Sequence, residues 1–226
     1  DKAGRNGLRA GEIRSVDFMD KYRERLRNHL NILKNYDFSF DINEYESGWF
    51  EGIEMINKFR IINTEYFIND LLAKGKRLLA EGAQGTMLDI DFGSYPFVTS
   101  SNTISAGACT GLGISPKKIG KIFGIFKAYC TRVGSSPFPT ELNDETGNML
   151  RNKGAEFGST TGRPRRCGWL DIPALKYAIM INGVTNLFMT KSDVLSGLDS
   201  VKVCTSYLSG TAKCEEIPFG DNEIQP

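Results

Sequence analysis

The stretch RLLAEGAQG (residues 77–85) decides the fold class, because a short apolar run there ends in a glycine-rich turn. The run from Arg77 to Ala80 is typical of a buried strand. Glycine-rich turns that follow such strands lie where open α/β sheets bind ligands. We therefore predict a strand over residues 77–80 and a ligand-binding turn directly after it.

The same strand–turn pattern recurs twice further along the chain. GIFKAYCTRV (residues 124–133) is rich in β-branched and aromatic residues and leads into the turn GSSP at 134–137. A buried strand predicted over 186–189 leads into TKSD at 190–193. Each predicted strand thus ends where a turn of small and polar residues begins.

Helices are predicted between these strands. Residues 141–152 and 172–182 are expected to be helical, and Pro173 is tolerated because it falls in the first turn. Strands that alternate with helices build a mostly parallel sheet. The predicted fold class is therefore α/β, with a mostly parallel sheet and flanking helices.

The N-terminal third has a different pattern, in which apolar residues recur at helical spacing. Helices are expected over 16–36 and 44–73, the second with a break near Asn63. His29 is the only histidine, and it lies among charged residues of the first predicted helix. We interpret it as an ordinary helix residue, although histidine is suited to proton transfer.

No linker or low-complexity tract separates the chain into independent parts, so residues 1–226 are expected to form a single domain. It would consist of a helical layer (1–75), an α/β core (76–208) and a tail (209–226). Alternating residues predict an edge strand over 201–208, and the acidic segment from Glu215 is expected to be a loop.

The overall composition argues against several classes of partner. A net charge of +1 gives no field that would attract a nucleic acid or a membrane surface, so neither is predicted. The five cysteines are widely spaced without a C-x-x-C pair, which predicts neither a disulfide framework nor a metal site and fits a reducing cytoplasm. The chain begins without a signal-peptide pattern and without an initiator Met, so we expect a fragment.

A second stretch, FGSTTGRPRR (residues 157–166), combines three hydroxyl residues, two glycines and three arginines. Gly158 and Gly162 permit unusual backbone conformations, and Pro164 excludes a helix interior. Guanidinium groups are forked donors suited to carboxylate or phosphate. A solvated basic turn is the alternative, but the hydroxyls beside the arginines favour a loop that binds an anion.

The turn TKSD (residues 190–193) has two interpretations. The carboxylate of Asp193 can accept hydrogen bonds from the N1–H and 2-amino groups of guanine, while the stem of Lys191 lies along the base. Asp193 can equally cap the start of a helix. Four residues alone do not decide between a guanine site and a cap.

Four long segments closely resemble the adenylosuccinate synthetase family, in order and over nearly the whole chain. They are EGAQGTMLDIDFGSYPFVTSSNT (81–103), TRVGSSPFPTEL (131–142), FGSTTGRPRRCGWLD (157–171) and TKSDVLSGLD (190–199). The resemblance implies a P-loop-NTPase-like fold. It also implies GTP-dependent ligation of IMP and L-aspartate to adenylosuccinate through 6-phosphoryl-IMP, in purine nucleotide biosynthesis.

The resemblance implies a set of residues that bind IMP: Arg5, Gln84, Leu88, Thr99, Val133 and Arg163. Gln84 would also act in catalysis, by offering its amide to the purine or its phosphorylated oxygen, and Thr99 would donate to the 5′-phosphate. Leu88 and Val133 can instead be core residues. Arg5 would reach the IMP phosphate of a neighbouring subunit, which implies a homodimer.

The resemblance assigns the other two substrates to the arginine loop and to TKSD. Aspartate would be held by Ser159, Thr160, Thr161, Arg163 and Arg165. GTP, the co-substrate, would be held by Arg165, Lys191 and Asp193. Arg166 is expected to face outward and to matter little for catalysis.

Other parts of the family's site have no counterpart here. No G-x-x-x-x-G-K run exists in the chain, and the catalytic Asp and His and the Mg²⁺ ligands of the family lie outside it. We therefore expect no metal site in this chain and no activity from it alone. Phe92 and Pro164 also depart from the family pattern. The alternative function is a catalytically silent nucleotide-binding or dimerisation module.

Overall fold

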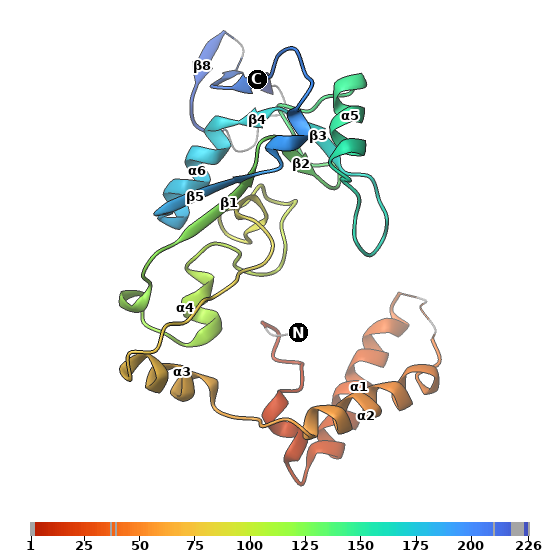
Figure 1. Ribbon diagram of the computed structural model, residues 1–226. Coiled ribbons are helices and arrows are strands. Elements are labelled where there is room, and N and C mark those ends of the chain that lie inside the picture. The colour runs from red at the N-terminus through yellow and green to blue at the C-terminus, as the bar shows by residue number, and fades with distance from the viewer. Residues whose placement is uncertain (1–2, 37, 39, 210, 218–223, 226) are drawn as a thin grey trace. The chain divides into compact units, whose positions relative to one another are not determined.

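The computed structural model describes residues 3–36, 38, 40–209, 211–217 and 224–225. Its contacts divide the chain into two compact units, Asp1–Lys74 and Gly75–Pro226. The sequence predicts a single domain with three parts, and this remains a prediction because the division into two compact units does not test it. Both units are drawn in Figure 1.

The first unit is helical, in agreement with the predicted helical layer. Its elements are the 3₁₀ helix η1 (Ala10–Arg14) and the helices α1 (Phe18–Lys34), α2 (Asn43–Asn57) and α3 (Thr64–Ala73). The expected break near Asn63 is present, because α2 ends at Asn57 and α3 begins at Thr64.

Aromatic side chains hold α1 against α2. The ring of Tyr22 stacks on Trp49 with centroids 4.8 Å apart and meets Phe50 edge-on at 5.3 Å. The Tyr22 hydroxyl donates to the Glu46 carboxylate at 2.8 Å. Burial, together with this carboxylate, raises the pKa of Tyr22 to about 12. Aromatic pairs of this kind stabilise a helix contact by more than their buried area alone accounts for.

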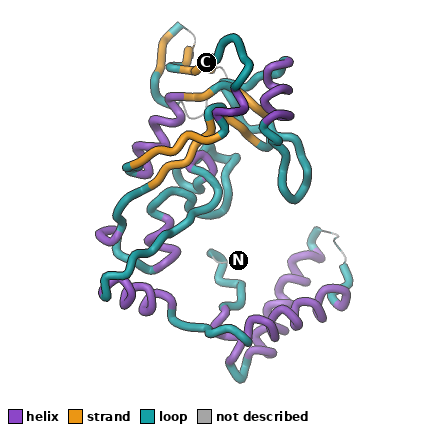
Figure 2. The backbone as a smooth tube through the Cα atoms, in the orientation of Figure 1, coloured by secondary structure: helices purple, strands orange, loops and turns teal. Residues whose placement is uncertain are grey.

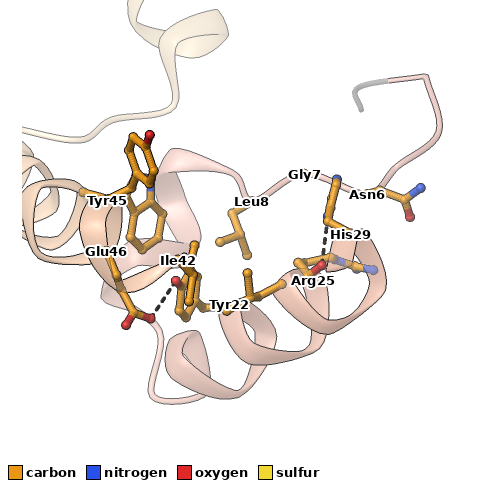
Figure 3. A pocket seen from close by; sticks show the side chains of 11 residues that line it. Asn6, Gly7, Leu8, Tyr22, Arg25, His29, Ile42, Tyr45 and Glu46 are labelled. Carbon is orange, nitrogen blue, oxygen red and sulfur yellow. Dashed lines mark hydrogen bonds between the residues drawn. The ribbon is translucent and has the colours of Figure 1, made fainter. Parts of the chain in front are cut away.

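A hollow of about 370 Å³ lies beside these aromatic residues (Figure 3). His29 lines it, and its Nδ1–H donates to the carbonyl of Arg25 at 2.8 Å within α1. This bond agrees with its interpretation as a helix residue. Asn6 and Gly7 also line the hollow, next to the exposed Arg5.

The second unit contains the strands and the remaining helices (Figure 2). Strand β1 (Phe123–Lys127) pairs in parallel with β5 (Asn186–Thr190), in a register that places Lys127 beside Thr190. The carboxyl ends of the two strands therefore meet at one edge. Ligands bind at such edges in α/β proteins, and the candidate site is built here.

Beyond this edge the chain forms an antiparallel pair that carries the core. Strand β2 (Cys130–Arg132) pairs with β3 (Arg166–Gly168), with Arg132 opposite Arg166. The buried core cluster consists of Tyr129, Leu150, Cys167 and Val194. It joins β2 and β3 to helix α5 (Glu145–Lys153) and to the 3₁₀ helix η4 (Ser192–Leu195).

Two predicted helices form at recognisable caps. Asp144 caps α5 by accepting a hydrogen bond from the N–H of Gly147 at 3.0 Å. Asp171 caps α6 (Ile172–Asn182) in the same way, and Gly183 ends it in the left-handed conformation. Asp171 also accepts from the buried Tyr207 hydroxyl at 2.6 Å, which ties the cap to the C-terminal strands.

The remaining elements complete the second unit. They are η2 (Thr86–Leu88), α4 (Gly107–Leu112), η3 (Pro116–Lys118), β4 (Leu170–Asp171), β6 (Val203–Cys204), β7 (Tyr207–Ser209), β8 (Ala212–Cys214) and β9 (Ile224–Gln225). Strands β4 and β6 run parallel, whereas β7 pairs antiparallel with β8 and β9. The α/β class is confirmed, with parallel and antiparallel pairs in several small sheets.

Three predicted strands differ in the structure. Residues 77–80 form no strand with the described residues. The single strand expected over 124–133 is two strands, because the chain changes partners from β5 to β3 around the buried Tyr129. The edge strand expected over 201–208 is likewise divided between β6 and β7.

The expected tail contains strands. The loop predicted from Glu215 onwards includes β9, which pairs with β7, while residues 218–223 and 226 lie outside the described residues. Alternation over a few residues does not predict such short pairings, because each is set by a distant partner strand.

Candidate functional site

The arginine stretch forms a hairpin that leaves the end of α5 and returns into β3 (Figure 1). Backbone hydrogen bonds close its stem. The N–H of Arg165 donates to the Glu156 carbonyl at 3.0 Å, and the N–H of Gly158 donates to the Arg163 carbonyl at 2.8 Å. Phe157 and Pro164 form a β-bridge between these two bonds. The predicted irregular loop is therefore present, with a closed stem.

The tip of the hairpin carries the hydroxyl residues. Ser159, Thr160 and Thr161 are exposed, and Gly162 adopts φ +64°, a left-handed conformation that glycine accepts without strain. Arg163 is also exposed, and its guanidinium has no hydrogen-bond or ion-pair partner among the described residues. The structure thus brings together four of the five predicted aspartate residues, with their donors accessible.

The fifth of these residues, Arg165, lies at the base of the hairpin and is held there. Its NH1 donates to Oε2 of Glu156 at 2.8 Å. The Glu156 side chain is only 1% exposed, and its carboxylate also accepts from Lys127 Nζ at 2.7 and 2.8 Å and from the Tyr129 hydroxyl at 2.7 Å.

The protonation state of this carboxyl group follows from its partners. Burial raises the pKa of Glu156, but the hydrogen bonds from Lys127 and Tyr129 and the nearby positive charges outweigh it, so the pKa is lowered. Burial next to the same carboxylate raises the pKa of the Tyr129 hydroxyl, which stays protonated and donates. Glu156 is therefore a buried anion that binds two cations.

Arg166 does not face outward, contrary to the prediction. Its guanidinium donates from Nε to Glu141 Oε1 at 2.7 Å and from NH2 to Oε2 of the same carboxylate. NH1 donates to the carbonyls of Gly134 and Ser136 at 2.8 and 2.7 Å. The guanidinium carbon lies 5.5 Å from the centre of the Phe138 ring. All three nitrogens thus bind groups of the protein.

A second loop region follows the glycine-rich turn and is organised by Asp89. This residue is fully buried. One carboxylate oxygen accepts from the N–H groups of Asp91 and Phe92, and the other from those of Thr103 and Ile104, at 2.6 to 3.2 Å. Burial raises its pKa, but these four donors outweigh that effect and lower it.

The predicted IMP residues of this unit cluster around that loop, except for Arg163. The N–H of Thr99 donates to the Leu88 carbonyl at 2.9 Å. Arg132 donates to the Ser94 hydroxyl and thereby brings the end of β2, next to Val133, onto the same loop. Val133 is 51% exposed, so it is not a core residue. Gln84 is exposed and free to meet a ligand.

The predicted GTP residues Lys191 and Asp193 follow β5. Lys191 has φ +62°, and its Nζ donates to the Gly154 carbonyl at 2.7 Å. The capping interpretation of Asp193 is wrong, because the N-cap of η4 is Lys191 and Asp193 lies inside the first turn with an exposed side chain. Arg5 belongs to the first compact unit and is exposed.

The sequence did not single out Glu156, Asp89 or Lys127. The available signal was the position of each charge: Glu156 directly precedes the arginine loop, Asp89 follows the glycine-rich turn, and Lys127 interrupts an apolar strand.

Among the residues that the structure describes, no group of three or more His, Cys, Asp or Glu side chains could hold a metal ion. In the same residues no helix is long and apolar enough to cross a membrane.

The fold and the hairpin define an α/β protein with an arginine-bearing loop open to an anionic ligand. The family model of adenylosuccinate synthetase matches residues 1–226. This chain belongs to the adenylosuccinate synthetase family.

Individual relatives agree. The chain is 60% identical over 231 residues to the adenylosuccinate synthetase of Cytophaga hutchinsonii and 56% identical over 227 residues to that of Bacteroides fragilis, covering 100% of this chain and 53% of each relative. It is similar to a structure of fully ligated adenylosuccinate synthetase from Plasmodium falciparum, with a TM-score of 0.84 and 41% identity over 95% of this chain and 52% of the other. The chain therefore spans about half the length of these relatives.

Proposed function

We propose that the whole protein containing this chain ligates IMP and L-aspartate to adenylosuccinate at the expense of GTP. The observation that carries the proposal is the hairpin, in which Arg163 and three hydroxyl residues are exposed at the tip and Arg165 is held by Glu156 at the base. A dicarboxylic acid needs several such donors at one place. Membership of the family supports the choice of substrates.

The chemistry has two steps. O6 of IMP takes the γ-phosphoryl group of GTP, while GDP leaves and the N1 proton of IMP passes to a base. The amine of aspartate then attacks C6, which releases phosphate and a proton. Cationic donors stabilise the charge on the phosphoryl oxygens, and the loop contributes by orienting the attacking amine. In this scheme Arg163 meets both IMP and aspartate, and Arg165 meets both aspartate and GTP.

The remaining residues keep the roles assigned from the resemblance. Gln84 offers its amide to the purine, while Leu88, Thr99 and Val133 line the IMP pocket. Asp193 reads the guanine edge, and Lys191, fixed through Gly154, places its stem along the base. Mg²⁺ would neutralise charge on the GTP phosphates, and its ligands would come from outside the described residues, in which no group of three or more His, Cys, Asp or Glu could hold a metal ion.

A turnover assay tests the proposal. The whole protein with IMP, GTP, Mg²⁺ and aspartate should form adenylosuccinate, and no product should form when any one substrate is omitted. The isolated chain should be inactive, because it lacks a G-x-x-x-x-G-K run or an equivalent. Nucleotide binding by the whole protein without any turnover would instead favour the silent binding module.

We also propose that the protein acts in the cytoplasm as a homodimer, in which Arg5 completes the IMP site of the neighbouring subunit. Mixing an Arg5→Ala protein with an Asp193→Asn protein should restore activity, because mixed dimers contain one site free of both changes. No recovery after verified subunit exchange would show that Arg5 does not act in trans.

A further inference from the structure

Glu156 is a buried carboxylate to which three separate segments donate. Lys127 stands at the end of β1, Tyr129 precedes β2, and Arg165 precedes β3. Each of the three places a donor within 2.8 Å of a Glu156 oxygen. The carboxylate thus lies where the carboxyl end of the β1–β5 pair meets the base of the arginine hairpin.

The charges at this point are unequal. One buried anion is shared by two cations, and its lowered pKa keeps it ionised. A buried charge that loses its partner is strongly unfavourable. Without Glu156, Lys127 and Arg165 would be two cations directed at the same place with no anion between them, so Glu156 controls where both point.

The three arginines of the hairpin differ in how many donors they have already used. Arg166 uses all three nitrogens on the protein. Arg163 uses none of its side-chain donors within the described residues. Arg165 is intermediate: NH1 binds Glu156, whereas Nε and NH2 have no partner there, and the side chain is 33% exposed. Glu156 therefore fixes one side of the Arg165 guanidinium, and the other side remains open to an anion.

We propose that Glu156 is the positioning residue of the site: it fixes Arg165 so that the free edge of its guanidinium meets the anionic ligands, and Lys127 and Tyr129 keep Glu156 in place. The inference rests on the proposed function, under which Arg165 contacts aspartate and GTP. A guanidinium that is already oriented loses less conformational entropy when a ligand binds. Glu156 itself does not touch the ligands.

The first test compares carboxylate replacements in the whole protein. Glu156→Gln keeps the size and removes the charge, and Glu145→Gln makes the same change at an exposed residue of α5. We expect Glu156→Gln to raise KM for aspartate and for GTP about tenfold, with KM for IMP changed less than about twofold. Glu156→Asp should recover part of the loss, and Glu145→Gln should behave as wild type.

A second test separates positioning from general structural support. In an Arg165→Leu background, Glu156→Gln should raise KM for aspartate no further, because the residue through which it acts is gone. Equal effects with and without Arg165 would overturn the proposal. So would wild-type KM values in Glu156→Gln. If Glu156→Gln does not fold, Tyr129→Phe, which removes only one donor to Glu156, should raise the same two KM values, and its failure to do so would also overturn it.

Failure of the proposed function would be distinguishable. If the wild-type protein forms no adenylosuccinate, GTP binding measured by calorimetry still tests the positioning role. The dissociation constant should then rise about tenfold in Glu156→Gln and stay unchanged in Glu145→Gln. An unchanged constant in both variants would overturn the role of Glu156 independently of the reaction.

Discussion

The tip and the base of the hairpin contain the same kinds of residue but use them in opposite ways. At the tip, Ser159 to Arg163 are exposed, and the guanidinium of Arg163 has no partner within the described residues. At the base, Arg165 is paired with Glu156 of the stem, and Arg166 is paired with Glu141 from outside the hairpin. The difference shows that the position of acidic partners, rather than the arginine itself, decides which arginine is available to a ligand.

The largest expected effect is on stability, at the base. Arg166→Leu removes the four hydrogen bonds that the Arg166 side chain donates and leaves Glu141 unpaired with its side chain 18% exposed. We expect the free energy of unfolding to fall by about 3 kcal/mol. Urea unfolding of the whole protein measures this loss. Arg163→Leu is the matched control at the tip and should change stability by less than about 0.5 kcal/mol.

When substrate binding is measured instead of stability, Arg163→Leu should have the larger effect and Arg166→Leu the smaller one. Arg163→Leu should weaken aspartate and IMP by about 2 kcal/mol each, because a charged hydrogen bond to a desolvated anion is lost. Steady-state KM values for aspartate and for IMP measure the two losses. Equal damage to stability from Arg163→Leu and Arg166→Leu would show that tip and base are not distinct.

A smaller effect concerns pH. The pKa of Glu156 lies below its ordinary value of 4.5 in the folded protein, so its ionised form stabilises the fold above pH 4.5, and this contribution is lost as the pH falls through the lower, folded pKa. Glu156→Gln lacks this dependence.

The stability difference between wild type and Glu156→Gln should therefore shrink below pH 4.5, by at most about 1.4 kcal/mol per pH unit. Denaturant unfolding between pH 3 and 7 measures it, roughly spanning the titration of a carboxyl group. Asp89 and Glu141 also have lowered pKa values, but they are common to both proteins and cancel. A constant difference across this range would show that the pKa of Glu156 is not lowered in the folded protein.

The sequence predicted the elements that depend on neighbouring residues. Helix α6 has its cap, Pro173 and Gly183 within one short segment, and its bounds were predicted. The α/β class followed from alternating strands and helices. An irregular loop was predicted over residues 157–166, since two glycines and a proline are decisive over so short a range. It is present up to Arg165, and Arg166 begins β3.

Features that depend on distant partners were not predictable in this way. The strand expected over 124–133 breaks because Tyr129 enters the core formed with α5 and β3. Arg166 faces inward because its guanidinium donates to Glu141, Gly134 and Ser136. These acceptors precede it in the sequence by 25, 32 and 30 residues. No local pattern contains this information, because hydrogen-bond partners are brought together only by the tertiary fold.

Hydrogen exchange of the hairpin amides tests the division between tip and base most directly. In the whole protein without ligands, the N–H groups of Gly158 and Arg165, which are bonded across the stem, should exchange slowly, and those of Ser159 to Thr161 should exchange fast. Adding aspartate, IMP and GTP should slow exchange at Ser159 to Thr161 and leave Arg165 nearly unchanged. Equal exchange rates at tip and base without ligand, or no protection of the tip on binding, would contradict the account.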